Sequence, residues 1–361
     1  MIFNIAMVLL SSGGSNATVW INPCGEGGQT VKVVLGSGKG GTVVAYSDDF
    51  MRSWDQTHLY RALQWLNANL GYTFTYYWSN CSGQYVSFLN DMWNNGPWDL
   101  VAVDHPACYE FGWDAWDDMY NWVNAGGKLV FSEFDLDGDQ QGSYQQLWNL
   151  LGAQGPYTDL GYAYDIYLWD FTHPLTNYTG PGGPNPLPSV YTGYWDDWWD
   201  DGDGTYKYSL PGDTVALLGG LTPTYQNGQA LITVKGPAGS WPCNTVLFSI
   251  LLAEWQDGAD TDGDGMNDAV ELWRNAIWAV REGCRSLVQD ETMPAAPEPG
   301  RLIVRAGEIF WTGQAPVECS AYDPLGRLGW QGTLEPGRGL RLADGLWFVM
   351  AEGQLVKVFA K

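Results

Sequence analysis

The stretch Thr42-Val43-Val44-Ala45-Tyr46-Ser47-Asp48-Asp49 opens the pattern that decides the fold. Its short apolar, β-branched run predicts a buried strand over 42–46. The segment 57–70 carries leucines at helical spacing and predicts an amphipathic helix. The leucines expected on its buried stripe are Leu59, Leu63, Leu66 and Leu70.

Strands and helices continue to alternate after this first pair. Further strands are predicted at 74–78, 99–103 and 128–132, and helices at 85–93, 113–123 and 144–151. Such alternation indicates a parallel sheet covered on both faces, so we expect an α/β, flavodoxin-like, doubly wound fold. Later strands are predicted at 214–218, 230–234 and 245–250, and a last helix at 269–280.

Four segments of the chain differ in composition. The apolar run 2–10, followed by small polar residues, predicts a leader over residues 1–22. It is an atypical leader, because no Lys or Arg precedes Lys32 and no clear cleavage site follows. Residues 23–290 form the predicted α/β domain and 291–300 a Pro-rich linker. Residues 301–361 show closely spaced strand and turn patterns typical of a small all-β sandwich. No other segment is long and apolar enough to span a membrane.

The segment 260–271 reads Asp-Thr-Asp-Gly-Asp-Gly-Met-Asn-Asp-Ala-Val-Glu. It has carboxylates at positions one, three, five, nine and twelve of a calcium loop and glycine at position six. The predicted ligands are Asp260, Asp262, Asp264, Met266 (through its carbonyl), Asp268 and Glu271. The alternative is an acidic turn that caps a helix, but a cap needs only one carboxylate. The segment before the loop reads as a strand, so we expect a structural calcium site and not a paired sensor.

Charge and cysteine usage narrow the function classes. The chain has 17 Lys+Arg against 41 Asp+Glu, a formal charge of −24, which argues against binding to nucleic acid or anionic membranes. Its 6 cysteines include no CxxC pair, so zinc and iron–sulfur sites are disfavoured and disulfides favoured.

Acidic residues follow several predicted strands. Ligands of open α/β sheets bind at the carboxyl ends of strands, near the point where strand order reverses. The residues expected there are Asp48, Asp49, Asp104, His105, Glu133 and Asp135. The segment Asp135-Leu-Asp137-Gly-Asp139 alternates like a calcium loop but has Gln140 where glycine belongs, so a second cation and a solvated loop stay alternatives.

An aromatic and acidic run covers residues 191–203. Trp195, Trp198 and Trp199 lie beside Asp196, Asp197, Asp200 and Asp201. Aromatic rings can stack on sugars and paired carboxylates can act as acid and base, so this run is a candidate carbohydrate site. The alternative is an acidic surface loop.

The last 60 residues resemble the C-terminal sorting domain of the type IX secretion system. The resemblance rests on Tyr322-Asp-Pro-Leu-Gly326-Arg327, on Gly345-Leu-Trp347-Phe348-Val349, where Trp347 replaces the usual Tyr, and on Val356-Lys357-Val358. It implies export by that machinery, with removal of the tail and attachment to the cell surface or release.

The segment from about Thr42 to Glu282 resembles the ThuA-like branch of the class I glutamine amidotransferase-like superfamily. It rests on 43–49, on Trp98-Asp-Leu-Val-Ala-Val-Asp104, on Tyr120-x-x-Val-x-x-Gly126-Gly127, and on Phe171-Thr-His173-Pro174. Amidotransferases of this fold need a cysteine on a glycine-flanked elbow. The matching residue here is Ser132, without those glycines, so the resemblance implies that this chemistry is lost.

Two further residues could carry chemistry. Cys108 follows a strand close to His105, and we expect a disulfide there in preference to a nucleophile. His173 precedes a proline and is expected to be a turn residue.

These observations predict an exported, calcium-binding protein at the cell surface or outside the cell. Its amidotransferase-like scaffold would serve a binding or structural role, with polysaccharide or a surface protein as partner. The alternative is a secreted carbohydrate-active hydrolase, or a metal-dependent hydrolase that uses Asp48, Asp104 and Glu133.

Overall fold

The computed structural model divides into two compact units, Met1–Leu287 and Val288–Lys361. The structure describes residues 5–10, 16–24, 28–36, 41–49, 51–81, 85–106, 111–138, 144–159, 165–181, 185–187, 190–192, 202–237, 244–254, 260–282, 302–305, 308–311, 316–322, 327–334, 340–343, 345–351 and 354–360. The predicted linker at 291–300 lies outside these ranges.

The centre of the larger unit is a parallel sheet. Its strands are β4 (Thr42–Ser47), β5 (Thr73–Ser79), β6 (Leu100–Asp104), β7 (Leu129–Ser132) and β16 (Thr245–Phe248), in the spatial order β5-β4-β6-β7-β16. The order reverses between β4 and β6, which is the topology of a flavodoxin-like sheet. The predicted doubly wound α/β fold is therefore confirmed.

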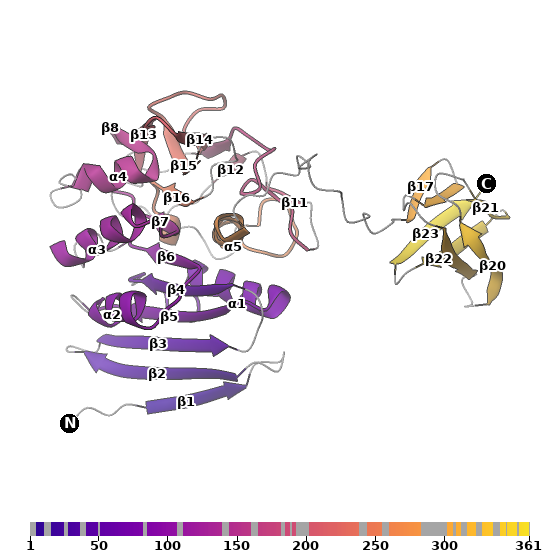
Figure 1. Cartoon of the computed structure of the whole chain (residues 1–361), viewed down its shortest axis with the longest axis horizontal. Helices are drawn as coiled ribbons and strands as arrows, with labels where there is room; N and C mark the ends of the chain where they lie inside the picture. Colours follow the sequence, from indigo (N-terminus) through magenta and orange to yellow (C-terminus); the bar gives the residue numbers. More distant parts are fainter. Residues whose placement is uncertain are drawn as a thin grey trace. The chain divides into compact units, whose positions relative to one another are not determined.

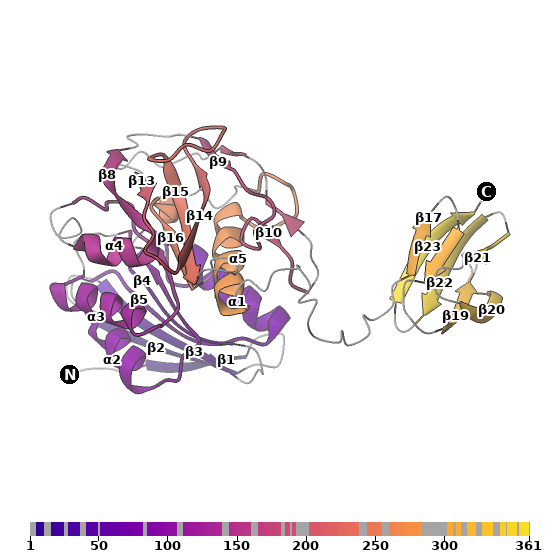
Figure 2. The same ribbon diagram turned by 45° about the horizontal axis from the view of Figure 1, so that its top comes forward.

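Helices cover both faces of this sheet (Figures 1 and 2). Helices α1 (His58–Leu70) and α5 (Asp268–Glu282) share a core with Val43 and Ala45 of β4. Helices α2 (Val86–Asn94), α3 (Trp113–Asn124) and α4 (Gln145–Leu151) share a second core with Val44 and Tyr46. Alternate residues of one strand thus enter opposite cores, as the twofold period of a strand requires.

Antiparallel strands extend the sheet at both edges. Beyond β5 lie β3 (Gly28–Gly36), β2 (Asn16–Cys24) and β1 (Ile5–Leu10). Beyond β16 lie β15 (Ala230–Pro237), β14 (Asp213–Gly220), β9 (Asp165–Leu168) and β12 (Val190–Thr192), while β13 (Asp203–Lys207) pairs with β15 and with β8 (Ala153–Asp159). The two-stranded sheet of β10 (Asn177–Tyr178) and β11 (Asn185–Pro186) completes the described strands of this unit.

A leader ending at residue 22 would remove β1 and most of β2. Ala17 and Val19 of β2 are buried in the core that α1 and α5 share. Cys24, at the end of β2, forms a disulfide with Cys81, which confirms that the chain uses disulfide bonds. The leader boundary itself stays a prediction.

The smaller unit contains two antiparallel sheets. One has β17 (Leu302–Arg305), β18 (Glu308–Trp311) and β21 (Leu340–Arg341); the other has β19 (Val317–Tyr322), β20 (Leu328–Leu334), β22 (Gly345–Ala351) and β23 (Gln354–Ala360). Ile309 from the first sheet and Ala321 and Val349 from the second share one small core, so the predicted all-β sandwich is confirmed. Cys319 is buried there as a free thiol.

Helix α1 begins at a side-chain cap that also contacts the sheet. The Thr57 hydroxyl accepts a hydrogen bond from the Tyr60 amide at 3.2 Å and lies 2.8 Å from the Tyr76 hydroxyl. Thr57→Ala removes both bonds, so we expect the free energy of unfolding to fall by about 1 kcal/mol. Thr57→Ser keeps the hydroxyl and should restore most of that loss in urea unfolding. Equal destabilisation by both substitutions would contradict a role of the cap.

None of the described helices is long and apolar enough to cross a membrane.

Candidate metal and ligand sites

The loop that precedes α5 turns its first three carboxylates toward one another. Ligand oxygens of Asp260, Asp262 and Asp264 all lie within 4.8 Å of one another. Asp260 accepts hydrogen bonds from the amides of Gly263 (2.7 Å) and Gly265 (2.9 Å), which folds the loop around its side chain. Gly265 has φ +91°, a conformation that side chains with a Cβ rarely adopt. The predicted glycine at position six therefore permits the bend.

The next two predicted ligands are held at the start of α5. Asp268 accepts bonds from the amide (2.9 Å) and hydroxyl (2.5 Å) of Thr261, and so ties the loop to the helix. Glu271 is fully buried and accepts a hydrogen bond from Arg274 at 3.0 Å. The pKa of Glu271 is raised to about 8, chiefly by burial; Arg274 opposes the rise, and the carboxylates of Asp264 and Asp262 contribute to it. A cation among these groups would offset both burial and repulsion.

Met266, the predicted carbonyl ligand, lies between these groups. Its amide donates to Asp264 at 2.8 Å, and its sulfur lies 3.4 Å from the Arg274 guanidinium. The structure thus brings Asp260, Asp262 and Asp264 together. Beside them lie Asp268, which is hydrogen-bonded to Thr261, and Glu271, which is hydrogen-bonded to Arg274. Five oxygen-bearing side chains in one turn suit a hard cation such as calcium.

The acidic residues at the strand ends also converge, as predicted. His105 Nδ1 lies 2.5 Å from Asp48 Oδ2, and His105 Nε2 lies 3.8 Å from Glu133 Oε2. Backbone hydrogen bonds fix this arrangement, because the His105 amide donates to the Ser132 carbonyl and the Glu133 amide to the Phe248 carbonyl. The cluster therefore spans the ends of β4, β6 and β7, at the point where strand order reverses.

The rest of this switch-point cluster is equally buried. Exposed fractions are 1% for Asp48, Asp104 and Glu133 and 0% for Asp49 and His105. Asp49 lies 3.5 Å from Arg52, while Ser47 donates to Asp104 at 3.4 Å. The ring of His105 stacks on Phe111 with centroids 4.2 Å apart. A substrate could reach these groups only after the surrounding chain moved.

Burial perturbs the carboxyl groups of this cluster. It raises the pKa of Asp49 to about 6, with Arg52 opposing, and that of Glu133 to about 8, with His105 opposing. It also raises the pKa of Asp104, and repulsion from Asp49 and Asp48 adds to the effect. Strong perturbation of this kind is common in functional sites but also occurs in structural ion clusters.

Ser132 has the surroundings of a structural residue. It is 3% exposed, and its hydroxyl donates to the Ile250 carbonyl at 3.2 Å. It ends β7 without flanking glycines, so an exposed nucleophile on a glycine-flanked elbow is not built here.

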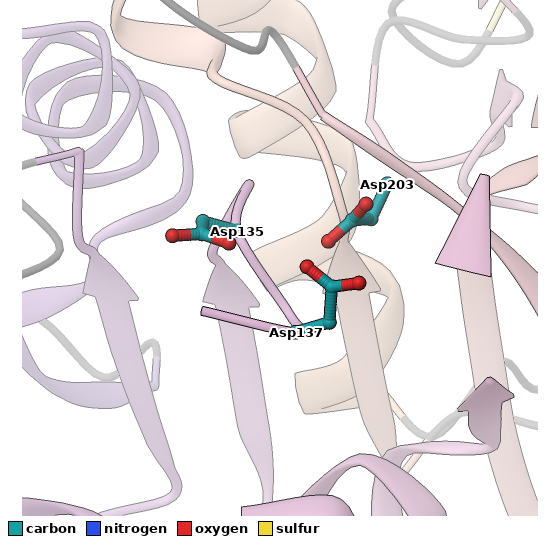
Figure 3. Close-up of side chains that lie close together, drawn as sticks. All are labelled: Asp135, Asp137 and Asp203. Atoms are coloured by element: carbon teal, nitrogen blue, oxygen red, sulfur yellow. The ribbon is translucent and has the colours of Figure 1, made fainter. Parts of the chain in front are cut away.

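A second group of carboxylates lies past the end of β7 (Figure 3). Asp135, Asp137 and Asp203 have ligand oxygens within 4.8 Å of one another, and the carboxylates of Asp137 and Asp203 face each other. Asp203 is 3% exposed and accepts a hydrogen bond from the Leu136 amide at 2.6 Å. Burial raises its pKa to about 8, although the Leu136 amide opposes the rise. Among the described residues, this group and Asp260, Asp262 and Asp264 are the two that place three acidic ligand atoms so close.

The alternation of aspartates at 135, 137 and 139 predicts Asp139 as the third member of that second group, whereas the structure has Asp203 there. Asp139 lies outside the described residues, whereas the Asp203 amide donates to the Ser249 carbonyl at the end of β16. The pairing of β13 with β8 and with β15 brings Asp203 to this position. The one sequence signal was its place at the end of the acidic run 191–203.

Several other predicted residues can be located. His173 is buried and its Nδ1 accepts from the Leu175 amide at 3.1 Å, as expected of a turn residue. The aromatic candidates Trp195, Trp198 and Trp199, their neighbouring aspartates and Cys108 lie outside the described residues.

Comparisons of this chain with protein-family models, with curated proteins and with solved structures found no match.

Proposed function

We propose that this chain is an exported calcium-binding protein whose amidotransferase-like α/β unit has a binding or structural role. The observation that carries the proposal is the loop 260–271, in which three carboxylates face one another and two more lie at the start of α5. The proposed cofactor is calcium.

The position of the loop explains why calcium would brace the larger unit. Helix α5 is buried on most of its surface and packs with α1 on one face of the sheet. Trp273 in the middle of α5 is fully buried. Its ring packs edge-on against the ring of Phe248 of β16, with ring centroids 5.6 Å apart. An ion that binds only the folded loop would stabilise the helix start and, through this packing, the whole core.

We propose that the amidotransferase-like unit has lost its catalytic activity, because Ser132 has structural surroundings and the switch-point cluster is buried. Export is proposed from the resemblance of the tail to a type IX sorting domain, which would make that secretion machinery a partner. The disulfide between Cys24 and Cys81 and the charge of −24 suit a calcium-containing medium outside the cell.

Titration of the full chain with calcium by calorimetry tests the proposal. We expect saturable binding that Asp260→Asn weakens at least about tenfold, because one carboxylate charge at position one is lost. Asp159→Asn is the matched control, since Asp159 is an exposed aspartate on β8. No heat of binding, or equal weakening by both substitutions, would overturn the calcium site.

A metal-dependent hydrolase is the second candidate, favoured by the convergence of Asp48, His105 and Glu133. Their burial supports it less well than an open cleft would, because hydrolysis needs access for substrate and water. Hydrolysis of any ester or glycoside that disappears in Asp48→Asn but persists in Asp159→Asn would favour this candidate over a non-catalytic role.

A further inference from the structure

A cavity of about 440 Å³ lies where strands β2, β3 and β5 meet helix α2. It belongs to the larger unit, and among the residues that the structure describes, none of those predicted as metal or ligand sites lines it. Small-molecule sites typically measure about 300–1,000 Å³. The volume would accommodate on the order of one or two sugar rings.

Three side chains form a row across the sheet at this cavity. Trp20 of β2 pairs with Lys32 of β3, and Lys32 pairs with Tyr77 of β5. Their neighbours Val19, Val31 and Trp78 belong to the core on the opposite face. The row therefore faces the side of the sheet where α2 packs, and Figure 1 shows β3, β2 and β1 continuing the sheet beyond that helix.

Lys32 is held between the two aromatic rings. Its Nζ lies 4.9 Å from the centre of the Tyr77 ring, 6.0 Å from that of Trp20, and 2.7 Å from Asp91 Oδ2. Asp91, on α2, also accepts from the Tyr77 hydroxyl. The positive charge is thus matched by a carboxylate inside the cavity wall, while Trp20 remains half-buried and Asn90 of α2 exposed at the rim.

This combination is selective about ligand chemistry. Aromatic faces stack on the C–H faces of sugar rings, and amide, ammonium and carboxylate groups bond sugar hydroxyls as donors and acceptors. Phosphate or uronate groups would meet the Asp91 carboxylate and a chain of formal charge −24, whose cation here is already paired. A purely apolar ligand would take this ion pair out of water without adding any hydrogen bond to it.

We propose that this cavity, with the half-buried Trp20 as stacking platform and Lys32, Asp91 and Asn90 as polar contacts, binds a neutral saccharide. Tyr77 is 7% exposed and forms the wall behind Lys32. The inference deepens the binding role of the proposed function and does not depend on the calcium loop. It moves the expected carbohydrate contact from the aromatic run 191–203 to the edge of the large sheet.

The test is binding of the full chain to neutral oligosaccharides, first on a glycan array and then by calorimetry, in calcium and in chelator. We expect Trp20→Ala to weaken binding about tenfold, as loss of one stacking contact implies. Trp113→Ala, at a tryptophan that is 52% exposed on α3, is the matched control and should bind like the parent.

A second pair of substitutions distinguishes a loss of binding from a loss of folding. Asn90 and Asn94 are both exposed on α2, and alanine favours the helix at each position. Asn90→Ala should weaken binding about threefold, as loss of one hydrogen bond implies, while Asn94→Ala should not. The proposal also requires that the exported chain retains Trp20, which intact-mass measurement checks.

Four outcomes would overturn the proposal: no neutral glycan bound by the folded chain, binding unchanged in both Trp20→Ala and Asn90→Ala, binding only to charged glycans or to peptides, or a mature chain that starts after Trp20. Glycan binding without any calcium binding would support this site while refuting the calcium loop, so the two failures are distinguishable.

Discussion

Removal of calcium is expected to lower the melting temperature of the larger unit by about 5–10 °C when the ion is initially present about 100-fold above its Kd. Binding to the folded state alone then contributes about 2.7 kcal/mol, and each kcal/mol shifts the melting temperature of a domain of this size by about 2–4 °C. Differential scanning calorimetry in calcium and in chelator measures the shift.

The control for this prediction is Asp260→Asn, whose shift in chelator should be at most about half that of the parent, because a tenfold weaker affinity leaves about 1.4 kcal/mol of stabilisation at the same calcium concentration. Hydrogen exchange then locates the effect: amides of α5 should exchange more slowly in calcium, while those of the separate sandwich unit should not change. A parent chain whose melting temperature ignores chelator would contradict the bracing role.

Glu133→Gln is expected to stabilise the protein at pH 8 by on the order of 4 kcal/mol and to have little effect near pH 4.5. Burial raises the pKa of Glu133 from its usual 4.5 to about 8, so the folded state holds this proton more tightly than the unfolded state. Below pH 4.5 both states are protonated. Between pH 4.5 and 8 only the unfolded state ionises, and stability falls as pH rises.

Glutamine keeps the shape of the protonated carboxyl and cannot ionise, so the variant should lose that part of the pH dependence. Urea unfolding at several pH values between 4.5 and 8.5 measures it. Glu282→Gln, at a half-buried glutamate at the end of α5, is the control and should keep the parent slope. An unchanged slope in Glu133→Gln would show that Glu133 is ionised in the folded protein.

The parallel half of the fold was predictable because its strands are short apolar runs and its helices have one apolar face. The strand predicted at 42–46 is β4 (Thr42–Ser47), and the helix predicted at 57–70 is α1 (His58–Leu70). Leu59, Leu63 and Leu66 are fully buried and Leu70 partly so, as the stripe predicted. The spacing of apolar residues within each element is enough to predict these elements, because its period identifies the element type and the buried face.

Of the antiparallel strands at the edges of the sheet, β14 (Asp213–Gly220) and β15 (Ala230–Pro237) match the strands predicted at 214–218 and 230–234, but others were missed. Strands β1 and β2 were assigned to a leader, because an apolar segment at the start of a chain can be either a leader or a strand and its composition does not distinguish them. β13 carries Asp203 within a segment interpreted as loop. Whether such segments pair depends on partners far along the chain, as when Asp203 meets Asp159 across β13 and β8.

The sequence by itself determined the alternating α/β pattern and the acidic loop 260–271 for which calcium is proposed, since both depend on residues only a few positions apart. Tertiary structure decided the meetings of distant side chains that the pattern did not predict: Asp203 beside Asp135, and Trp20 in line with Lys32 and Tyr77. Strand order and register bring these groups together, and they depend on the summed packing of the whole core, which no local spacing encodes.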